Sequence, residues 1–503
     1  MLAIIAGCAW LLFLVDDGLG VAWPQNAVRN WEQFGFFNLH GQLITNPGGY
    51  EATTDPQIYG GMSPVCLWLV YWATKLFGWT GLGTMSFHIL LALAVFWAIW
   101  NLTGRDQLAF AIAAAAVLCP GYVRWQKILD PNTIPVLLSL PFATVVLDLL
   151  KKERLGLYAC VGLFALTLGF TTLNWTTAWA YGLCALWLLC LPGVSRRRVL
   201  LFTALAGTSC ILFAIASVIA KAGGGHARIS GVNPVELMRG YMWGNTGYGL
   251  GMTTGKMLLR LSFVTAVGLL PLLLVLISLT VKQVNRANYR IWPAVPPFAL
   301  GIAEVAIMRN YFGHHPWMAA PVLLVGLVYS LAVLRIHVAS DTVSTPRPTA
   351  HARVSFLAGA IPFFAFLYCL AVLIFFRANA ANELSLVNLV RHHTERSACI
   401  VIVKGLDPQT AQLAPRFDEL LDRRVVIIDD LHHLPGNQGP VVILSSVTLK
   451  DSVTLLAQTS GNGTSPRPWL QATVDWFNHS IARRRAGDRL ELGNSYYLYR
   501  PES

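Results

Sequence analysis

The chain has 503 residues, of which 55% are hydrophobic and only 12% are charged, and its mean hydropathy is +0.54. Soluble domains carry roughly 25% charged residues, so this composition excludes an ordinary soluble protein and indicates a polytopic membrane protein. A formal net charge of +12 would suggest a nucleic-acid partner in a soluble chain, but here the basic residues lie in short loops between apolar stretches and indicate topology instead.

About eleven apolar stretches predict membrane-spanning helices, since a span takes about 20 residues with a range near 17 to 25. The expected spans are residues 2–15, 84–102, 107–122, 132–150, 156–173, 176–192, 199–220, 258–281, 292–308, 316–336 and 356–376. The length of the first stretch also suits a signal peptide. It has neither a preceding basic segment nor a small-residue cleavage site, so we interpret it as a span.

The basic residues predict which loops face the cytoplasm. With a cytoplasmic amino terminus, every strongly basic short loop falls inside, as the positive-inside rule expects. These loops are residues 101–106, 151–154, 195–198, 282–290 and 335–353. The outer face then receives the loop that begins at Asp16, residues 122–132, 223–256 and 309–316, and the chain after residue 377. We therefore predict a multi-pass protein of the bacterial inner membrane.

The composition changes to that of a soluble domain after residue 376. Short β-rich runs at 399–403, 425–428, 441–444 and 496–499 alternate with the amphipathic helical patterns 408–421 and 469–484. The predicted organisation is thus a transmembrane domain over residues 1–378, whose outer loop spans 16–83, and a soluble extracytoplasmic α/β domain over 379–503.

Two aspartates, Asp16 and Asp17, follow the first apolar stretch and open this outer loop. A carboxylate at the mouth of a helical bundle is where a membrane enzyme would hold a catalytic base. The alternative interpretation is a solvated residue at the membrane boundary.

The loop itself predicts two helices that lie along the membrane surface. The first has apolar residues at Ala27, Val28, Trp31 and Phe34, with Pro24 at its start and Gly35 past its end. The second covers residues 64–77, where Trp, Tyr and Lys side chains are typical membrane anchors.

The order of these features resembles that of the GT-C glycosyltransferases. The matching residues are Asp16-Asp17, residues 27–35, the segment Ser63-Pro64-Val65 and the segment Lys75-Leu76-Phe77-Gly78, so the resemblance covers the first hundred residues best. Protein O-mannosyltransferases and the aminoarabinose transferases of lipid A belong to this group and use polyprenyl-phosphate sugars. Family members often carry Asp-Glu where this chain has Asp16-Asp17, which leaves open which aspartate is the base.

The resemblance implies an α-helical, GT-C-like membrane protein that transfers a sugar with inversion from a polyprenyl-phosphate donor to an extracytoplasmic lipid, glycan or protein. Such a transfer needs a carboxylate to accept the proton of the acceptor and cations to stabilise the leaving phosphate. With a monophosphate donor no cofactor is required. A lipid-diphosphate donor would more often need a divalent metal.

The remaining candidates for binding the donor phosphate or the substrate lie at the outer ends of spans or in outer loops: Arg124, Lys127, Asp130, Arg239, Glu304, Arg309, Tyr311, His314 and His315. Glu304 falls within a predicted span, where an ionisable group indicates function by default. The structural alternatives are helix capping by Asp130 and basic side chains that extend to the membrane surface.

A transporter or flippase is the main rival class. Transporters typically show paired broken spans, internal repeats and ionisable residues near the membrane midplane. This chain instead concentrates its candidate chemistry in outer loops, which favours the transferase.

Overall fold

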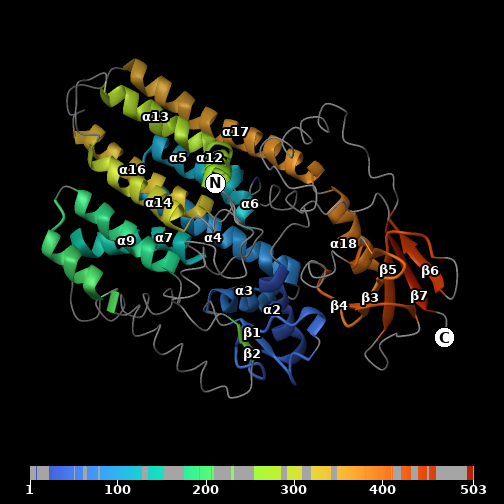
Figure 1. The fold of residues 1–503 in the computed structure, drawn as a ribbon. Helices are drawn as coiled ribbons and strands as arrows, with labels where there is room; N and C mark the ends of the chain where they lie inside the picture. Colours follow the sequence, from blue (N-terminus) through green and yellow to red (C-terminus); the bar gives the residue numbers. More distant parts are fainter. Residues whose placement is uncertain are drawn as a thin grey trace.

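The structure is a computed structural model in which long helices pack beside a small mixed sheet (Figure 1). It describes residues 7, 22–49, 51–59, 65–77, 80–126, 134–151, 175–191, 193–205, 207–208, 228–230, 254–284, 292–308, 319–340, 348–379, 381–408, 410–411, 421–431, 440–449, 453–459 and 496–501.

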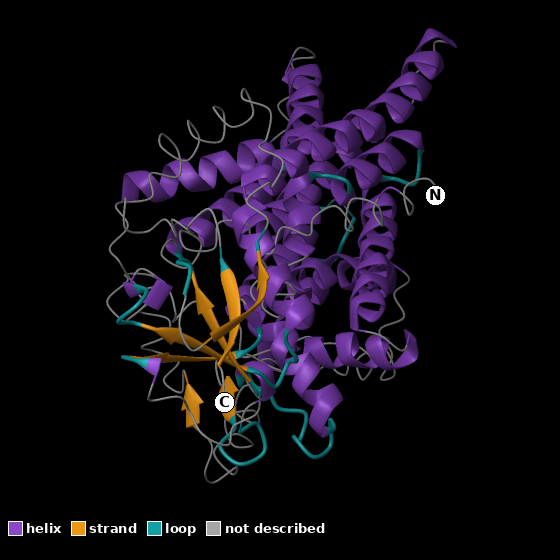
Figure 2. Cartoon of the chain, turned by 90° about the vertical axis from the view of Figure 1, so that its right-hand side faces the viewer, coloured by secondary structure: helices purple, strands orange, loops and turns teal. Residues whose placement is uncertain are grey.

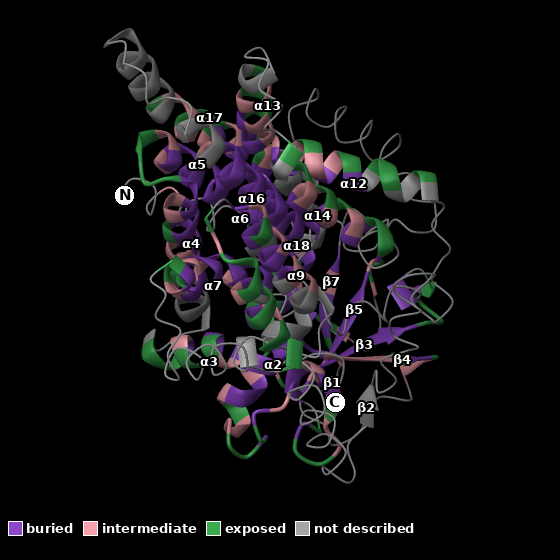
Figure 3. Cartoon of the chain, turned by 90° about the vertical axis from the view of Figure 1, so that its left-hand side faces the viewer, coloured by how far each residue is buried: buried purple, intermediate pink, exposed green. Residues whose placement is uncertain are grey.

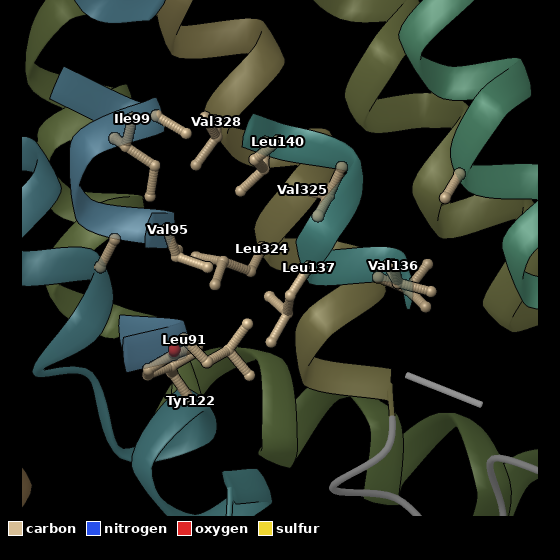
Figure 4. Close-up of a cluster of buried hydrophobic side chains, with 14 of the residues drawn as sticks. Leu91, Val95, Ile99, Tyr122, Val136, Leu137, Leu140, Leu324, Val325 and Val328 are labelled. Carbon is tan, nitrogen blue, oxygen red and sulfur yellow. The ribbon is translucent and has the colours of Figure 1, made fainter. Parts of the chain in front are cut away.

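The long helices form a bundle around α16. Its elements are α4 (Thr80–Thr103), α5 (Gln107–Val117), α6 (Pro120–Gln126), α7 (Ile134–Lys151), α9 (Trp175–Cys190), α12 (Thr254–Gly268), α13 (Leu270–Val284), η2 (Trp292–Ala294), α14 (Val295–Ile307), α16 (Ala319–Ser340) and α17 (Pro348–Asn379). Figure 3 shows α16 at the buried centre, and Figure 4 shows Leu324, Val325 and Val328 of α16 among side chains of α4 and α7. A helix that is apolar all round belongs in such a position.

Helices cover nearly all the described residues of the expected spans 84–102, 132–150, 176–192, 292–308, 316–336 and 356–376. Two other expected spans are broken rather than continuous, and both breaks lie at prolines, which lack the N–H needed to continue a helix. Stretch 107–122 divides into α5 and α6 before Pro120, and stretch 258–281 divides into α12 and α13, which are bent by 79° before Pro271. Expected span 156–173, all of 2–15 except Gly7, and most of 199–220 lie outside the described residues.

Within the part of the chain that the structure describes, one helix, Ser86–Thr103, is by itself long and apolar enough to cross a membrane. The bent pair α12–α13 adds a second if it counts as one span, and Gln107–Val117, Val295–Ile307, Ala319–Arg335 and Gly359–Phe375 are apolar but shorter. The number of spans therefore stays a prediction.

Two basic side chains connect helix ends that are distant in the sequence. Arg335 forms an ion pair with Asp106 and donates to the Thr103 carbonyl at 3.2 Å. Arg198 donates to the Leu150 carbonyl at 3.5 Å. Each contact joins two segments that were expected on the same side of the membrane, and the topology itself stays a prediction.

The first outer loop folds into what we call the first-loop module, residues 22–77. It contains α2 (Ala22–Phe34), η1 (Pro47–Gly49), β1 (Gln57–Tyr59) and α3 (Val65–Phe77). Strand β1 pairs in parallel with β2 (Arg228–Ser230), so the first loop and the long loop 223–256 share a two-stranded sheet. Gly35 ends α2 with a φ of 91°, as predicted for the glycine after this helix.

The apolar face of α2 does not lie on the membrane surface, which corrects the prediction. Trp31 is fully buried, and its ring packs edge-on against Phe36 and Tyr71, with centroids 5.4 and 5.9 Å away. Its indole N–H donates to the Gln42 carbonyl at 2.8 Å. The amphipathic pattern was correct, but α3 and the following loop cover it instead of lipid. Large apolar side chains of α3, such as Leu76, remain exposed.

The C-terminal domain, residues 381–501, begins with α18 (Ala381–His393) and has a sheet of the order β4-β3-β5-β7-β6. The strands are β3 (Cys399–Val403), β4 (Arg424–Ile428), β5 (Val441–Ser445), β6 (Val453–Gln458) and β7 (Tyr497–Pro501). Strands β4, β3 and β5 are parallel, whereas β7 and β6 are antiparallel. Figure 2 shows this sheet at one end of the helical bundle. All four predicted strands are present, and their ends differ from the predicted ends by at most two residues. The predicted helix 469–484, and all of 408–421 except residues 408, 410, 411 and 421, lie outside the described residues.

Candidate functional site

Of the predicted site residues, Arg124 and Glu304 lie within the described residues. The others lie outside them: Asp16, Asp17, Lys127, Asp130, Arg239, Arg309, Tyr311, His314 and His315. For most of these segments, however, the structure describes the residues that come just before or after them in the sequence.

Glu304 is buried where α14 packs tightly on α16. The two helices approach through glycines: a Cβ added to Gly326 would lie 3.0 Å from the Pro297 carbonyl oxygen, and one added to Gly301 would lie 3.6 Å from that of Val322. This pairing is antiparallel, so one further turn brings Glu304 level with the start of α16.

Glu304 is 1% exposed, and neither carboxyl oxygen has a hydrogen-bond partner among the described residues. One turn before Glu304, the indole N–H of Trp179 of α9 donates to the Leu300 carbonyl at 3.0 Å and not to the carboxyl group. Burying a carboxyl group without partners is unfavourable, so such a group is retained where its chemistry is needed. The structure therefore keeps Glu304 as a candidate.

Arg124 is buried on α6, and it also lies near the start of α16. Gly121, one turn earlier, packs against Ala320 and against the Gly268 carbonyl oxygen, which lie 3.0 and 3.1 Å from the position of an added Cβ. The end of α12, the short helix α6 and the start of α16 thus meet at one point. Figure 4 shows Tyr122 of α6 beside Leu91 of α4, in the same region.

These placements bring several predicted segments to one end of the bundle. The connection that carries Arg309, Tyr311, His314 and His315 runs from Met308, at the end of α14, to the start of α16. The connection that carries Lys127 and Asp130 begins at the end of α6. A buried carboxyl, a buried guanidinium and the ends of two polar connections therefore lie around the amino-terminal end of α16.

The aspartate pair is bracketed by two described positions. Gly7 lies against Phe366 of α17 and Leu118, since a Cβ added there would be 3.4 and 3.9 Å from their side chains. Leu118 joins α5 to α6, the helix that carries Arg124. On the other side, α2 begins at Ala22. Asp16 and Asp17 themselves lie outside the described residues, between these two positions in the sequence.

A charged contact that the sequence did not predict joins the first-loop module to the C-terminal domain. Asp422, which is buried, accepts hydrogen bonds from Arg29 of α2 at 2.6 Å and from Arg396 at 2.9 Å. Burial alone would raise the pKa of Asp422, but attraction to Arg396 and Arg29 outweighs it and holds the pKa below its ordinary value. Nothing in the local sequence marks this aspartate, because its partners are remote in the chain.

No group of three or more His, Cys, Asp or Glu side chains that could hold a metal ion occurs in the described ranges. The metal question therefore rests on the segments outside them.

The chain matches no protein-family model and none of the curated proteins. Among solved structures, it is similar to the crystal structure of ArnT from Cupriavidus metallidurans bound to undecaprenyl phosphate. The TM-score is 0.51 at 12% sequence identity, and the match covers 91% of this chain and 96% of that chain. At this identity the likeness concerns the fold: over nearly its whole length, the chain has a GT-C-like fold similar to that of ArnT.

Proposed function

We propose that the protein is a membrane glycosyltransferase that moves a sugar from a polyprenyl-phosphate donor to a lipid, glycan or protein acceptor on the extracytoplasmic face of the bacterial inner membrane. The observation that carries the proposal is the likeness in fold to ArnT, whose structure contains undecaprenyl phosphate. The exposed apolar side chains on the outside of the bundle, among them Trp97, Leu259 and Phe363, suit a lipid environment.

The proposed reaction forms a bond between an acceptor oxygen or nitrogen and the anomeric carbon of the sugar, while the bond from that carbon to the phosphate oxygen breaks. Asp16 or Asp17 accepts the proton of the acceptor, and the polyprenyl phosphate leaves with the bonding electrons. Attack opposite the leaving group inverts the anomeric centre. A monophosphate leaving group can be stabilised by cationic side chains, so this reaction requires no cofactor.

Of the proposed binding residues, Arg124 and Glu304 lie near the amino-terminal end of α16, and most of the others belong to connections that begin or end there. Arg124, Arg309, His314 and His315 would neutralise the donor phosphate, as guanidinium and imidazolium groups bind phosphate oxygens by charge-assisted hydrogen bonds. Lys127, Arg239 and Tyr311 would also bind the donor phosphate. Asp130 would help to position the acceptor. Glu304 would orient one of the arginines or contact the sugar.

The test is release of free polyprenyl phosphate, with transfer of the label, from a panel of radiolabelled polyprenyl-phosphate sugars by the purified protein in lipid nanodiscs supplied with lipid, glycan and peptide acceptors. We expect turnover with at least one sugar, lost in either Asp16→Asn or Asp17→Asn while the variant stays folded. Turnover with no donor in the panel would refute the transferase.

A flippase remains the second candidate because of one observation, the 79° bend between α12 and α13 beside Gly121 of α6. Broken helices at a buried crossing are typical of transporter binding sites. In proteoliposomes loaded with the same labelled lipids, movement of the label across the bilayer without release of polyprenyl phosphate would favour this function over transfer.

A further inference from the structure

Helix α2 lies between two layers of the protein. On one side, Trp31 packs against Tyr71 of α3 and fixes the helix to the first-loop module. On the other side, the helix faces the C-terminal domain, and the contacts there are polar. We call these contacts the Asp422 network, which consists of Arg29, Asn30, Gln33, Gly48, Arg396 and Asp422.

One carboxylate joins the two parts of the chain. Asp422 Oδ2 accepts from Arg29 Nη1 at 2.6 Å and from Arg396 Nε at 2.9 Å. Asp422 Oδ1 accepts from Arg396 Nη2 at 3.3 Å and from the backbone N–H of Gly48 at 3.2 Å. Both oxygens are therefore shared between the first-loop module and the C-terminal domain.

Arg396 also donates in the opposite direction, from the C-terminal domain to α2. Its Nη2 donates to Asn30 Oδ1 and its Nη1 to Gln33 Oε1, both at 2.8 Å. Asn30 in turn donates to the carbonyls of Ile44 and Asn46, at 2.8 and 3.1 Å. The hydrogen bonds thus run without a break from the entry of β4, through α2, to the loop that follows it.

The backbones approach closely at this contact as well. A Cβ on Gly48 would lie 2.7 Å from the Arg396 carbonyl oxygen, and Gly48 has a φ of 63°. Directional bonds and a close backbone fit specify one relative orientation, whereas an apolar contact allows sliding. Removing one partner of a buried ion pair leaves the others uncompensated, so the docked arrangement depends on Asp422.

We propose that the C-terminal domain positions the catalytic aspartate segment through the Asp422 network, with Asp422 and Arg396 as positioning residues of the transfer reaction. This inference rests on the proposed function. Helix α2 begins at Ala22, shortly after Asp17, so the orientation of α2 sets where the aspartate segment ends. Misplacement of a reacting group by about 1 Å can slow a reaction by about 10²-fold.

The test uses the full-length protein in lipid nanodiscs with Asp422→Asn, which keeps the shape of the side chain and removes its charge. Asp407→Asn is the matched control, because Asp407 is a buried aspartate whose bonds stay within the C-terminal domain. It accepts from the backbone N–H of Thr410 at 3.0 Å and of Ser446 at 2.6 Å. Arg29→Met removes the ion pair between α2 and Asp422 and leaves the pair of Asp422 with Arg396, within the domain, unchanged.

Two quantities are measured: hydrogen exchange of the amides of α2, with those of β3 as a check that the domain is folded, and kcat and KM for the best donor of the panel. For Asp422→Asn and Arg29→Met we expect exchange protection of α2 and kcat to fall by at least about 10-fold, with donor KM changed less than about 3-fold, because the base rather than the donor site moves. Asp407→Asn with an intact β3 should retain both values.

Three results would overturn the inference: unchanged protection of α2, unchanged kcat despite a loosened α2, or an equal loss of kcat in the control with β3 intact. If the wild-type protein turns over no donor, the proposed function fails and the positioning role fails with it. The exchange data then still show whether Asp422 holds α2, so the two failures are distinguishable.

Discussion

Replacing Trp31 by alanine should loosen α2 strongly. Trp31 is fully buried, and large-to-small substitution of such a side chain typically lowers the free energy of unfolding by about 3–5 kcal/mol. The two edge-on ring contacts and the bond to the Gln42 carbonyl are part of that loss. Because about 1.4 kcal/mol is a factor of ten, exchange protection of the α2 amides should fall by about 150- to 4,000-fold.

Two variants make this measurement specific. Trp31→Phe keeps an aromatic ring and removes the indole N–H, so it should lower protection by about 1–3 kcal/mol, the effect of leaving a buried carbonyl unpaired. Trp97→Ala makes the same deletion at a half-exposed position of α4 and should leave α2 unchanged. If Trp31→Ala changed protection less than about 3-fold, the reasoning would be refuted, since that is the outcome for a ring that faces lipid rather than protein.

Three further predictions follow from charge, close packing and burial. The lowered pKa of Asp422 means that its ion pairs stabilise the docked domain above about pH 4, the ordinary range of an aspartate, and that this stabilisation is lost as the pH falls through the lowered pKa. Protection of α2, corrected for intrinsic exchange, should therefore be equal at pH 7 and 5 and fall only below that range; loss already at pH 6 would contradict this. Gly326→Ala should lower the thermal unfolding temperature, by overpacking of about 1–3 kcal/mol against Pro297, whereas Gly359→Ala, with open space around it, should not. Glu304→Leu should raise the unfolding temperature, because it removes a buried carboxyl group that has no partner among the described residues. It should also reduce release of polyprenyl phosphate, because Glu304 is proposed to orient an arginine or contact the sugar. A lower unfolding temperature would show that the carboxyl group has a structural partner.

Features encoded by local composition were predictable. Apolar stretches gave most of the helices, and β-branched runs gave β3 and β5, because burial in a bundle or a parallel sheet selects continuous apolar segments. Strand β6 was missed, since it is mostly exposed and its register shifts between Leu455 and Ala457, which interrupts the alternating pattern. The breaks before Pro120 and Pro271 fall inside apolar runs, where hydropathy alone does not reveal them.

Features that depend on docking were not predictable. The pattern of α2 indicated which face is apolar but not that α3 rather than lipid covers it. Arg29 and Asp422 are 393 positions apart, and no local pattern connects them. Of the candidate site, the burial of Glu304 was accessible from its place within an apolar stretch. The burial of Arg124, which was expected in the outer loop 122–132, and the position of both residues near the start of α16 came only from the packing of α6 and α14 on that helix.

The pairing of Arg29 with Asp422 also determines when, during synthesis of the chain, the contacts of α2 can form. At about 5–20 residues per second, synthesis of the 393 intervening positions takes roughly 20–80 s. Throughout that interval α2 has been made, but Arg29, Asn30 and Gln33 still lack the partners that Arg396 and Asp422 supply. The first-loop module, among the earliest parts of the chain to emerge, is therefore among the last to be completed. A chain truncated before residue 396 would lack every partner that the C-terminal domain supplies to α2.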